Sequence, residues 1–236
     1  MPNPYIPLEC NPEVLSSLSH SLGISKQLSF HDVYSIDDPE LLSFIPRPVY
    51  ALLLVFPVSE SYETHRIVAD SDVTEYSASP EDTILWLKQT IPNACGTMAL
   101  LHSLLNIPQQ DKYVIEGSLI SDFHKDLPHL SVAERIKYIE SSESLSSLHD
   151  AAARSGDTST PDALDDVDLH YVTLVKSQSG DLWELDGRRK GPIFLTALGP
   201  DLDVLSPASI KFVKEFIDRE SSNISFSLVA LAPSSD

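Results

Sequence analysis

The segment from Lys88 to Asn106 constrains this chain most, because it places a cysteine where an apolar helix begins. Asn93 is a residue type that caps helices, and residues 94–106 then run as a mostly apolar helix. A cysteine in a first helical turn lies near the positive end of the helix dipole and near unpaired N–H groups, which lowers the pKa of a thiol. Cys95 is therefore either a buried core residue or a thiolate nucleophile, and residues far along the chain decide between the two.

Two predicted strands downstream bring a histidine and an aspartate together. Residues 168–176 are β-branched and aromatic, and residues 182–186 form a second strand after a turn that contains serine and glycine. A hairpin centred on Gln178 puts His170 opposite Asp186 on one face of the sheet, where facing Cβ atoms lie about 4.5–5.5 Å apart. A slip of one residue would send the two side chains to opposite faces, so this contact depends on the turn.

A cysteine at a helix start together with a His–Asp pair is the arrangement that a thiol nucleophile needs. We predict that Cys95 attacks, that His170 acts as general acid and base, and that Asp186 orients the imidazole. Gln89, six residues before Cys95, is the predicted side-chain donor to the oxyanion, alongside the Cys95 N–H. His102 follows on the same helix at roughly 10 Å, beyond hydrogen-bond reach of Cys95. The cysteines and histidines show no metal-ligand spacing, so we predict no metal site.

Several stretches of the sequence carry a family resemblance. The most specific read Lys-Gln-Thr-Ile-Pro-Asn-Ala-Cys-Gly-Thr at 88–97 and Glu-Leu-Asp-Gly-Arg at 184–188. The others are residues 7–13, 32–34, 39–42, 46–48 and 168–170. In these stretches the chain resembles the small, single-domain members of the ubiquitin carboxyl-terminal hydrolase family. The stretches run in family order, so the resemblance covers essentially the whole chain.

The resemblance implies an α+β fold of the papain-like type, with a central antiparallel β-sheet, helices on both faces and a knotted backbone. It implies one catalytic domain over residues 1–236 and no cofactor. It assigns Cys95, His170, Asp186 and Gln89 the catalytic roles given above. It also implies a crossover loop, which we place at residues 153–167 and expect to be mobile, arching over the active-site cleft. Such a loop would limit the leaving group to small or unfolded adducts.

The charge of the chain bears on its partner. Sixteen Lys and Arg against 35 Asp and Glu give a net charge of −19, which disfavours nucleic acid. Acidity is compatible with a basic partner, although it also serves solubility. The resemblance implies ubiquitin, whose tail is basic and ends in Gly-Gly. We predict that Asp32 meets this tail, with Glu9 as a second candidate, and that Leu8 and Leu169 are further substrate contacts.

Two alternatives remain open from the sequence. The first is a hydrolase that acts mainly on another ubiquitin-like modifier such as NEDD8. The second is a protein that binds and stabilises free ubiquitin, with catalysis incidental.

The sequence also leads to expectations about the location of the protein in the cell and about one basic segment. We expect no signal peptide, and the apolar stretch at 49–58 is too short to cross a bilayer, so we predict no membrane association. Two cysteines, one of them needed as a free thiolate, favour a reducing compartment, so we expect a cytoplasmic and possibly also nuclear monomer. The basic run at 187–191 is predicted to be a solvated turn.

Overall fold

The structure is a computed structural model that describes residues 3–158, 169–219 and 226–235. Its strands are β1 (Leu28–Asp32), β2 (Ala51–Pro57), β3 (Leu169–Lys176), β4 (Asp181–Leu185), β5 (Ile193–Ala197) and β6 (Ser227–Pro233). Its helices are α1 (Pro12–Leu22), α2 (Pro39–Ser43), α3 (Glu60–Asp70), α4 (Cys95–Leu105), α5 (Gln110–Tyr113), α6 (Leu119–Asp126), α7 (Val132–Glu140), α8 (Glu143–Ala153) and α9 (Pro207–Arg219), with a short 3₁₀ turn at Leu127–His129.

Within the described residues, six strands form one sheet in the order β1-β6-β2-β3-β4-β5, and every neighbouring pair is antiparallel. The central strand β2 is apolar along its length, because side chains from both of its faces are buried. Ala51, Leu53 and Val55 belong to one buried cluster. Leu52, Leu54 and Phe56 belong to the other. The sheet therefore has two covered faces.

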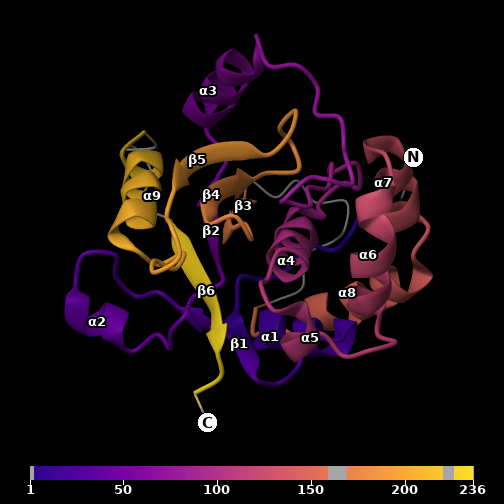
Figure 1. Cartoon of the computed structure of the whole chain (residues 1–236), viewed down its shortest axis with the longest axis horizontal. Helices are drawn as coiled ribbons and strands as arrows, with labels where there is room; N and C mark the ends of the chain where they lie inside the picture. Colours follow the sequence, from indigo (N-terminus) through magenta and orange to yellow (C-terminus); the bar gives the residue numbers. More distant parts are fainter. Residues whose placement is uncertain (1–2, 159–168, 220–225, 236) are drawn as a thin grey trace.

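Different helices cover the two faces of the sheet. On the first, which we call the α4 face, lie α4, α1 and the helices α5 to α8. On the second, the α9 face, α9 contributes Ile210, Val213 and Phe216. Figure 1 shows α9 on one side of the sheet, the group around α4 on the other, and α3 at one end of the molecule. The predicted α+β architecture, with an antiparallel sheet between helical layers, is confirmed. The knot implied by the resemblance stays a prediction.

The hairpin of β3 and β4 forms, but its register differs from the predicted one. Leu174 pairs with Glu184 rather than with Leu182. The turn at residues 177–180 forms, and Gly180 ends it with a φ of 90° in the left-handed region, but the pairing is centred on Ser179 rather than on the predicted Gln178. The displacement is by two residues, which keeps each side chain on its predicted face. His170 and Asp186 therefore still face the same way, although they are not directly opposed.

The apolar run at residues 84–88 predicts a strand from sequence, and this prediction is wrong. This stretch has no strand partner among the described residues, because side chains satisfy its backbone instead. Asn106 accepts from the Leu85 N–H and donates to the Leu85 carbonyl. Arg135 of α7 donates to the Trp86 carbonyl at 3.1 Å. His102 accepts from the Leu87 N–H at 3.0 Å. An apolar, extended run of this kind looks like a strand in sequence, and only the packing of α4 and α7 shows that it is not.

Candidate active site

Cys95 is the first residue of α4, close to where the sequence predicts a helix start. The predicted cap is wrong: the N-cap is Ala94, and it makes no side-chain capping bond. Asn93 instead has a φ of 58°, a left-handed conformation that asparagine tolerates and that turns the chain into the helix. At the first helical position the Cys95 N–H precedes the intrahelical bonds and is available to a ligand. Cys95 thus lies at the positive end of a buried helix.

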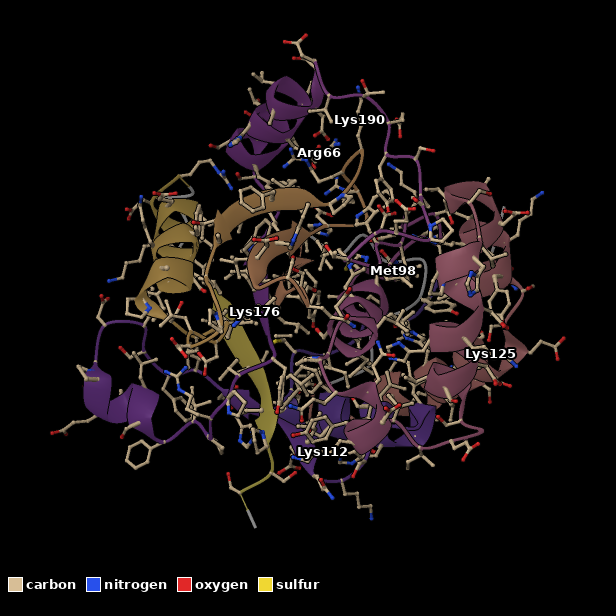
Figure 2. All side chains as sticks on the ribbon, viewed as in Figure 1. Arg66, Met98, Lys112, Lys125, Lys176 and Lys190 are labelled. Carbon is tan, nitrogen blue, oxygen red and sulfur yellow. The ribbon has the colours of Figure 1, made fainter. Side chains whose placement is uncertain are left out.

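Gly96 explains why a poor helix former follows the cysteine. A Cβ on Gly96 would lie 3.0 Å from the Cβ of Leu8 and 3.4 Å from the ring of Tyr171. Glycine therefore lets the N-terminal segment and β3 approach the start of α4 closely. Every residue of α4 from Gly96 to Leu105 is buried, so apolar packing fixes the axis of this helix. Figure 2 shows Met98 of α4 within this helical layer.

His170 and Asp186 form the predicted contact. The Nε2 atom of His170 lies 2.9 Å from Oδ1 of Asp186, and both side chains are almost fully buried. The thiol of Cys95 is a second hydrogen-bond partner of the His170 side chain. The Cys95 sulfur also lies 3.8 Å from the carbonyl oxygen of Leu169, the residue before the histidine. The start of β3 therefore meets the start of α4, and three side chains far apart in the sequence come together.

Charge stabilises the proton on the imidazole. Burial works to lower the pKa of His170, but the Asp186 carboxylate and the bond to Cys95 outweigh it and raise this pKa to about 9. Burial likewise works against the charged form of Asp186, but His170, the Tyr62 hydroxyl and the Arg188 N–H lower the pKa of that carboxyl below its ordinary value. The pair is therefore an imidazolium facing a carboxylate at neutral pH.

Gln89 is held against the loop that carries Asp186. Its backbone N–H donates to the Gly187 carbonyl at 2.9 Å, and the Trp86 indole donates to the Asp186 carbonyl at 3.1 Å. A Cβ on Gly187 would lie 2.8 Å from the Cβ of Gln89, so this approach requires glycine. The side-chain amide of Gln89 donates a long bond of 3.4 Å to the Ile91 carbonyl. Its buried Oε1 has no partner among the described residues.

A cavity of about 270 Å³ opens beside the cysteine. Its lining includes Leu8, Glu9, Cys10, Cys95, Leu169 and Tyr171. Leu8, Glu9 and Leu169, three of the predicted substrate contacts, thus share a cavity with the cysteine. Asp32 does not line it. That residue is exposed at the end of β1, near enough to Cys10 that burial and its charge together raise the pKa of Cys10 to about 12. A larger hollow of about 900 Å³ lies at the opposite end of β2 and β3, away from this chemistry.

Glu9 already has partners inside the chain. Its Oε2 accepts from the hydroxyl of Thr158 at 2.7 Å and from the Thr158 N–H at 3.1 Å. These bonds lower the pKa of Glu9. Residues 159–167 of the predicted crossover loop lie outside the described residues. Of the part that is described, Ala153 and Thr158 line the cavity.

The basic run at 187–191 is not the predicted solvated turn, because its side chains bind α3 and the chain that follows it. Arg188 pairs with Glu63, and Arg189 pairs with Asp70 at 2.8 Å. Lys190 donates to the Val73 carbonyl at 3.0 Å. Figure 2 shows Arg66 of α3 and Lys190 at the same end of the molecule. Sequence analysis predicted neither α3 nor this contact; the one local signal was Ser59, which caps the helix by accepting from the Tyr62 N–H.

Among the described ranges 3–158, 169–219 and 226–235, no group of three or more His, Cys, Asp or Glu residues is arranged to hold a metal ion. In the same part of the chain, no helix is both long and apolar enough to cross a bilayer.

A helix-start cysteine, a buried His–Asp pair and an amide beside one antiparallel sheet covered by helices on both faces define a cysteine hydrolase of the papain-like class. Comparisons with known proteins narrow this class. The model of the family described as "Ubiquitin carboxyl-terminal hydrolase, family 1" matches residues 5–218. Ubiquitin carboxyl-terminal hydrolase 3 of Arabidopsis thaliana is 35% identical over 229 residues, which cover 97% of this chain and 94% of the relative. The Drosophila melanogaster ubiquitin carboxyl-terminal hydrolase is 36% identical, with 96% of each chain covered. The chain belongs to the ubiquitin carboxyl-terminal hydrolase family.

Solved structures agree on the fold. The UCH37 catalytic domain of Trichinella spiralis, in a crystal structure bound to ubiquitin vinyl methyl ester, superposes with a TM-score of 0.75 at 23% identity. The match covers 98% of this chain and 95% of that one.

Proposed function

We propose that this chain is a thiol-dependent hydrolase that cleaves the bond after the C-terminal glycine of ubiquitin. The observation that carries the proposal is the hydrogen-bonded His170–Asp186 pair, which meets the thiol of Cys95 at the rim of a cavity in a chain of this family. A protein that merely bound ubiquitin would have no need of a thiol, an imidazole and a carboxylate in contact at one site.

The chemistry has two halves. In the first, the thiolate of Cys95 forms a bond to the glycine carbonyl carbon, and the oxyanion is held by the Cys95 N–H and the side-chain amide of Gln89. His170 gives its proton to the leaving amine or thiol as that bond breaks. In the second half, His170 takes a proton from water, the hydroxide attacks the thioester, and the Cys95 thiolate leaves. Free ubiquitin with a C-terminal carboxylate is released.

Gln89 suits the oxyanion role because its side chain is weakly engaged. Its amide N–H makes one long bond of 3.4 Å within the described residues, which it can exchange for a stronger bond to a developing negative charge. The backbone bond to Gly187 keeps the residue near Asp186 throughout.

We propose that acidic residues guide the basic tail of ubiquitin to the cavity. Asp32 is exposed and near Cys10, so it could receive a basic side chain outside the cavity mouth. Glu9 is at the rim but is bonded to Thr158, so it would have to change partners. We expect Asp32→Ala to raise the dissociation constant for ubiquitin with less effect on kcat. Titration calorimetry with the Cys95→Ala protein tests this, and an unchanged dissociation constant removes Asp32 from the site.

The size of the leaving group is a further part of the proposal. We propose that the enzyme releases small or unfolded adducts, supported by the contact of Thr158 with Glu9, which holds the chain at the cavity rim. Inserting Gly-Ser repeats into residues 159–167 should then admit folded ubiquitin conjugates. Unchanged substrate size would contradict it.

We propose a monomer located in the cytoplasm, with the nucleus as a second location, that acts on ubiquitin, with NEDD8 as the alternative modifier. Both Cys10 and Cys95 are free thiols, which supports a reducing compartment.

The decisive experiment is release of a fluorophore from the C-terminus of ubiquitin by the wild type and by Cys95→Ala, with a NEDD8 substrate in parallel. Cys10→Ala is the matched control, since it removes the other thiol at the same cavity. We expect turnover that Cys95→Ala abolishes and Cys10→Ala retains. Faster turnover of the NEDD8 substrate would reassign the modifier. Tight ubiquitin binding without turnover would make the chain a receptor.

A further inference from the structure

The carboxylate of Asp186 has a donor that the chemistry above does not use. Oδ1 accepts from His170 Nε2 at 2.9 Å and from the Arg188 N–H at 2.8 Å. The hydroxyl of Tyr62 donates to the other oxygen, Oδ2, at 2.7 Å. Among the described residues this is the one hydrogen bond to Oδ2. Tyr62 therefore decides which way the plane of the carboxylate faces.

The helix that carries Tyr62 is built around this loop. Two residues of α3 are buried, Tyr62 and Asp70. Asp70 pairs with Arg189, and the neighbouring Glu63 pairs with Arg188. Both buried side chains of α3 thus reach the loop that follows Asp186, and a third side chain joins them from the helix surface.

Ring contacts hold the Tyr62 hydroxyl in place. The ring lies 4.9 Å from that of Phe56, edge to face, and 6.1 Å from that of Phe216, between centroids. The guanidinium of Arg188 lies 5.8 Å over its face. A tyrosine has two rotatable side-chain torsions, and these ring contacts already restrict both. Forming the hydrogen bond to Asp186 therefore costs little further conformational entropy.

We propose that Tyr62 is a positioning residue for the reaction, which holds Oδ2 of Asp186 so that Oδ1 faces the imidazole of His170. The proposal deepens the proposed function and rests on it. Without the hydroxyl, both remaining donors lie on Oδ1, and the carboxylate can rotate about its Cβ–Cγ bond. The bond to His170 then weakens, and the imidazolium loses part of its stabilisation.

The hydroxyl can play this part at any pH the enzyme meets. Burial and the Asp186 charge raise the pKa of Tyr62 well above its ordinary value, so the phenol keeps its proton and stays a donor. The other charged or titratable groups acting on Asp186 or Tyr62 are Glu184 of β4, Arg66 of α3, Arg188 of the loop and His102 of α4. Burial and Asp186 raise the pKa of Glu184 to about 7, so this group titrates near neutrality and its effect must be separated from that of His170.

The test is Tyr62→Phe, which removes the hydroxyl and keeps the ring. Tyr50→Phe is the matched control, because the Tyr50 hydroxyl is also buried and bonded, to Tyr113, at the opposite end of β2. We expect Tyr62→Phe to lower kcat roughly 10-fold with little change in KM, because one bond to a charged group is lost. We also expect the alkaline limb of the kcat/KM profile to move from about 9 to lower pH. Tyr50→Phe should change neither.

A double-mutant cycle asks whether Tyr62 acts through Asp186. In an Asp186→Asn background, Tyr62→Phe should have little further effect on kcat/KM. Full additivity, or an alkaline limb that stays in place or moves to higher pH in the single variant, would overturn the proposal. Combining Tyr62→Phe with Glu184→Gln separates the titration of Glu184 from that of His170. The shift of the alkaline limb of the kcat/KM profile should persist in this double variant.

Alkylation of the free enzyme by iodoacetamide separates this proposal from the proposed function, because it needs no ubiquitin. We expect Tyr62→Phe to slow modification of Cys95 at pH 7, read peptide by peptide. Cys10 is an internal reference, since burial raises its pKa to about 12 and keeps it a thiol. If wild type fails to cleave ubiquitin but the alkylation rates differ, the positioning role stands and the proposed function fails. Equal alkylation rates overturn the positioning role.

Discussion

The two ends of the catalytic arrangement are held by different forces. Cys95 begins a helix that is buried from Gly96 to Leu105, so close apolar packing places the nucleophile. Asp186 lies in a loop held by hydrogen bonds from Tyr62 and by the ion pairs of Arg188 and Arg189. Apolar packing is insensitive to charge, whereas polar contacts respond to pH, salt and single atoms. The nucleophile end should therefore govern stability and the Asp186 end should govern rate.

Removing the charge of Asp186 should have the largest effect. Asp186→Asn leaves the shape intact but takes the counter-ion from a buried imidazolium, so we expect kcat/KM to fall by roughly 10³–10⁴-fold. Steady-state cleavage of a ubiquitin fluorophore measures it. Asp181→Asn, at the other end of β4, is the control and should be near wild type. A loss below tenfold would show that His170 is oriented without this carboxylate.

Truncating a buried side chain of α4 should lower the stability of the protein and leave its turnover rate nearly unchanged. Leu104 is fully buried on the α4 face, so Leu104→Ala should cost about 3 kcal/mol of unfolding free energy. At a temperature where the variant is fully folded, we expect kcat to stay near wild type. Urea unfolding followed by fluorescence gives the first quantity and turnover the second. A large loss of kcat at full folding would mean that α4 tunes the chemistry as well as the stability.

Raising the pH should remove the proton from His170 and so weaken its contact with Asp186. His170 binds its proton more tightly in the folded protein, with a pKa of about 9 against an ordinary 6.5. Its contribution to stability is therefore complete below about 6.5 and is lost as the pH rises through about 9. Turnover should fall over the same upper limb, because the leaving group then lacks its proton donor. The difference in unfolding free energy between wild type and His170→Gln, measured from pH 6 to 10, isolates this group; a flat difference would contradict it.

The smallest effect should come from the ion pair between α3 and the Asp186 loop. Glu63 and Arg188 are partly exposed, so Glu63→Gln should cost about 0.5–1 kcal/mol at low salt and less at high salt. Lys211 and Glu215, an exposed pair on α9, provide the control, and Glu215→Gln should be near neutral. Unfolding midpoints at low and high salt decide the matter. Equal salt dependence of the two variants would show that the α3 pair is no better shielded than the surface one.

Local sequence patterns predicted much of the site. The β-branched run of β3 and the turn after it placed His170 near Asp186, the periodicity of α4 placed Cys95 at a helix start, and the chemistry that a thiol nucleophile needs joined the two. The predicted register was displaced by two residues, because the pairing is centred on Ser179 and not on Gln178. The predicted pair survived, since a shift of two preserves the face on which a side chain lies.

Sequence reasoning failed where distant segments meet through polar groups. The stretch at 84–88 is apolar and extended, so it was wrongly predicted to be a strand. Its backbone partners are side chains from α4 and α7, which the local sequence does not show. The basic run after Asp186 was wrongly predicted to be a solvated turn, because its acidic partners are on α3, more than a hundred residues earlier in the chain. Tyr62 had no signal at all: a tyrosine on an unpredicted helix gives no hint that its hydroxyl meets a catalytic carboxylate.

The sequence by itself determined the chemistry of this protein, because residue types and spacings of two or about 3.6 fix which side chains share a strand face or a helix start. Those patterns led to the proposed nucleophile and acid–base pair, and the family resemblance carried by the sequence implied a sheet with helices on both faces. The tertiary structure alone decided how Asp186 is aimed, what holds Gln89 beside it and which acidic residue lies at the cavity. Those contacts join segments that no local periodicity relates, so they exist only once α3, α4 and the hairpin have packed together.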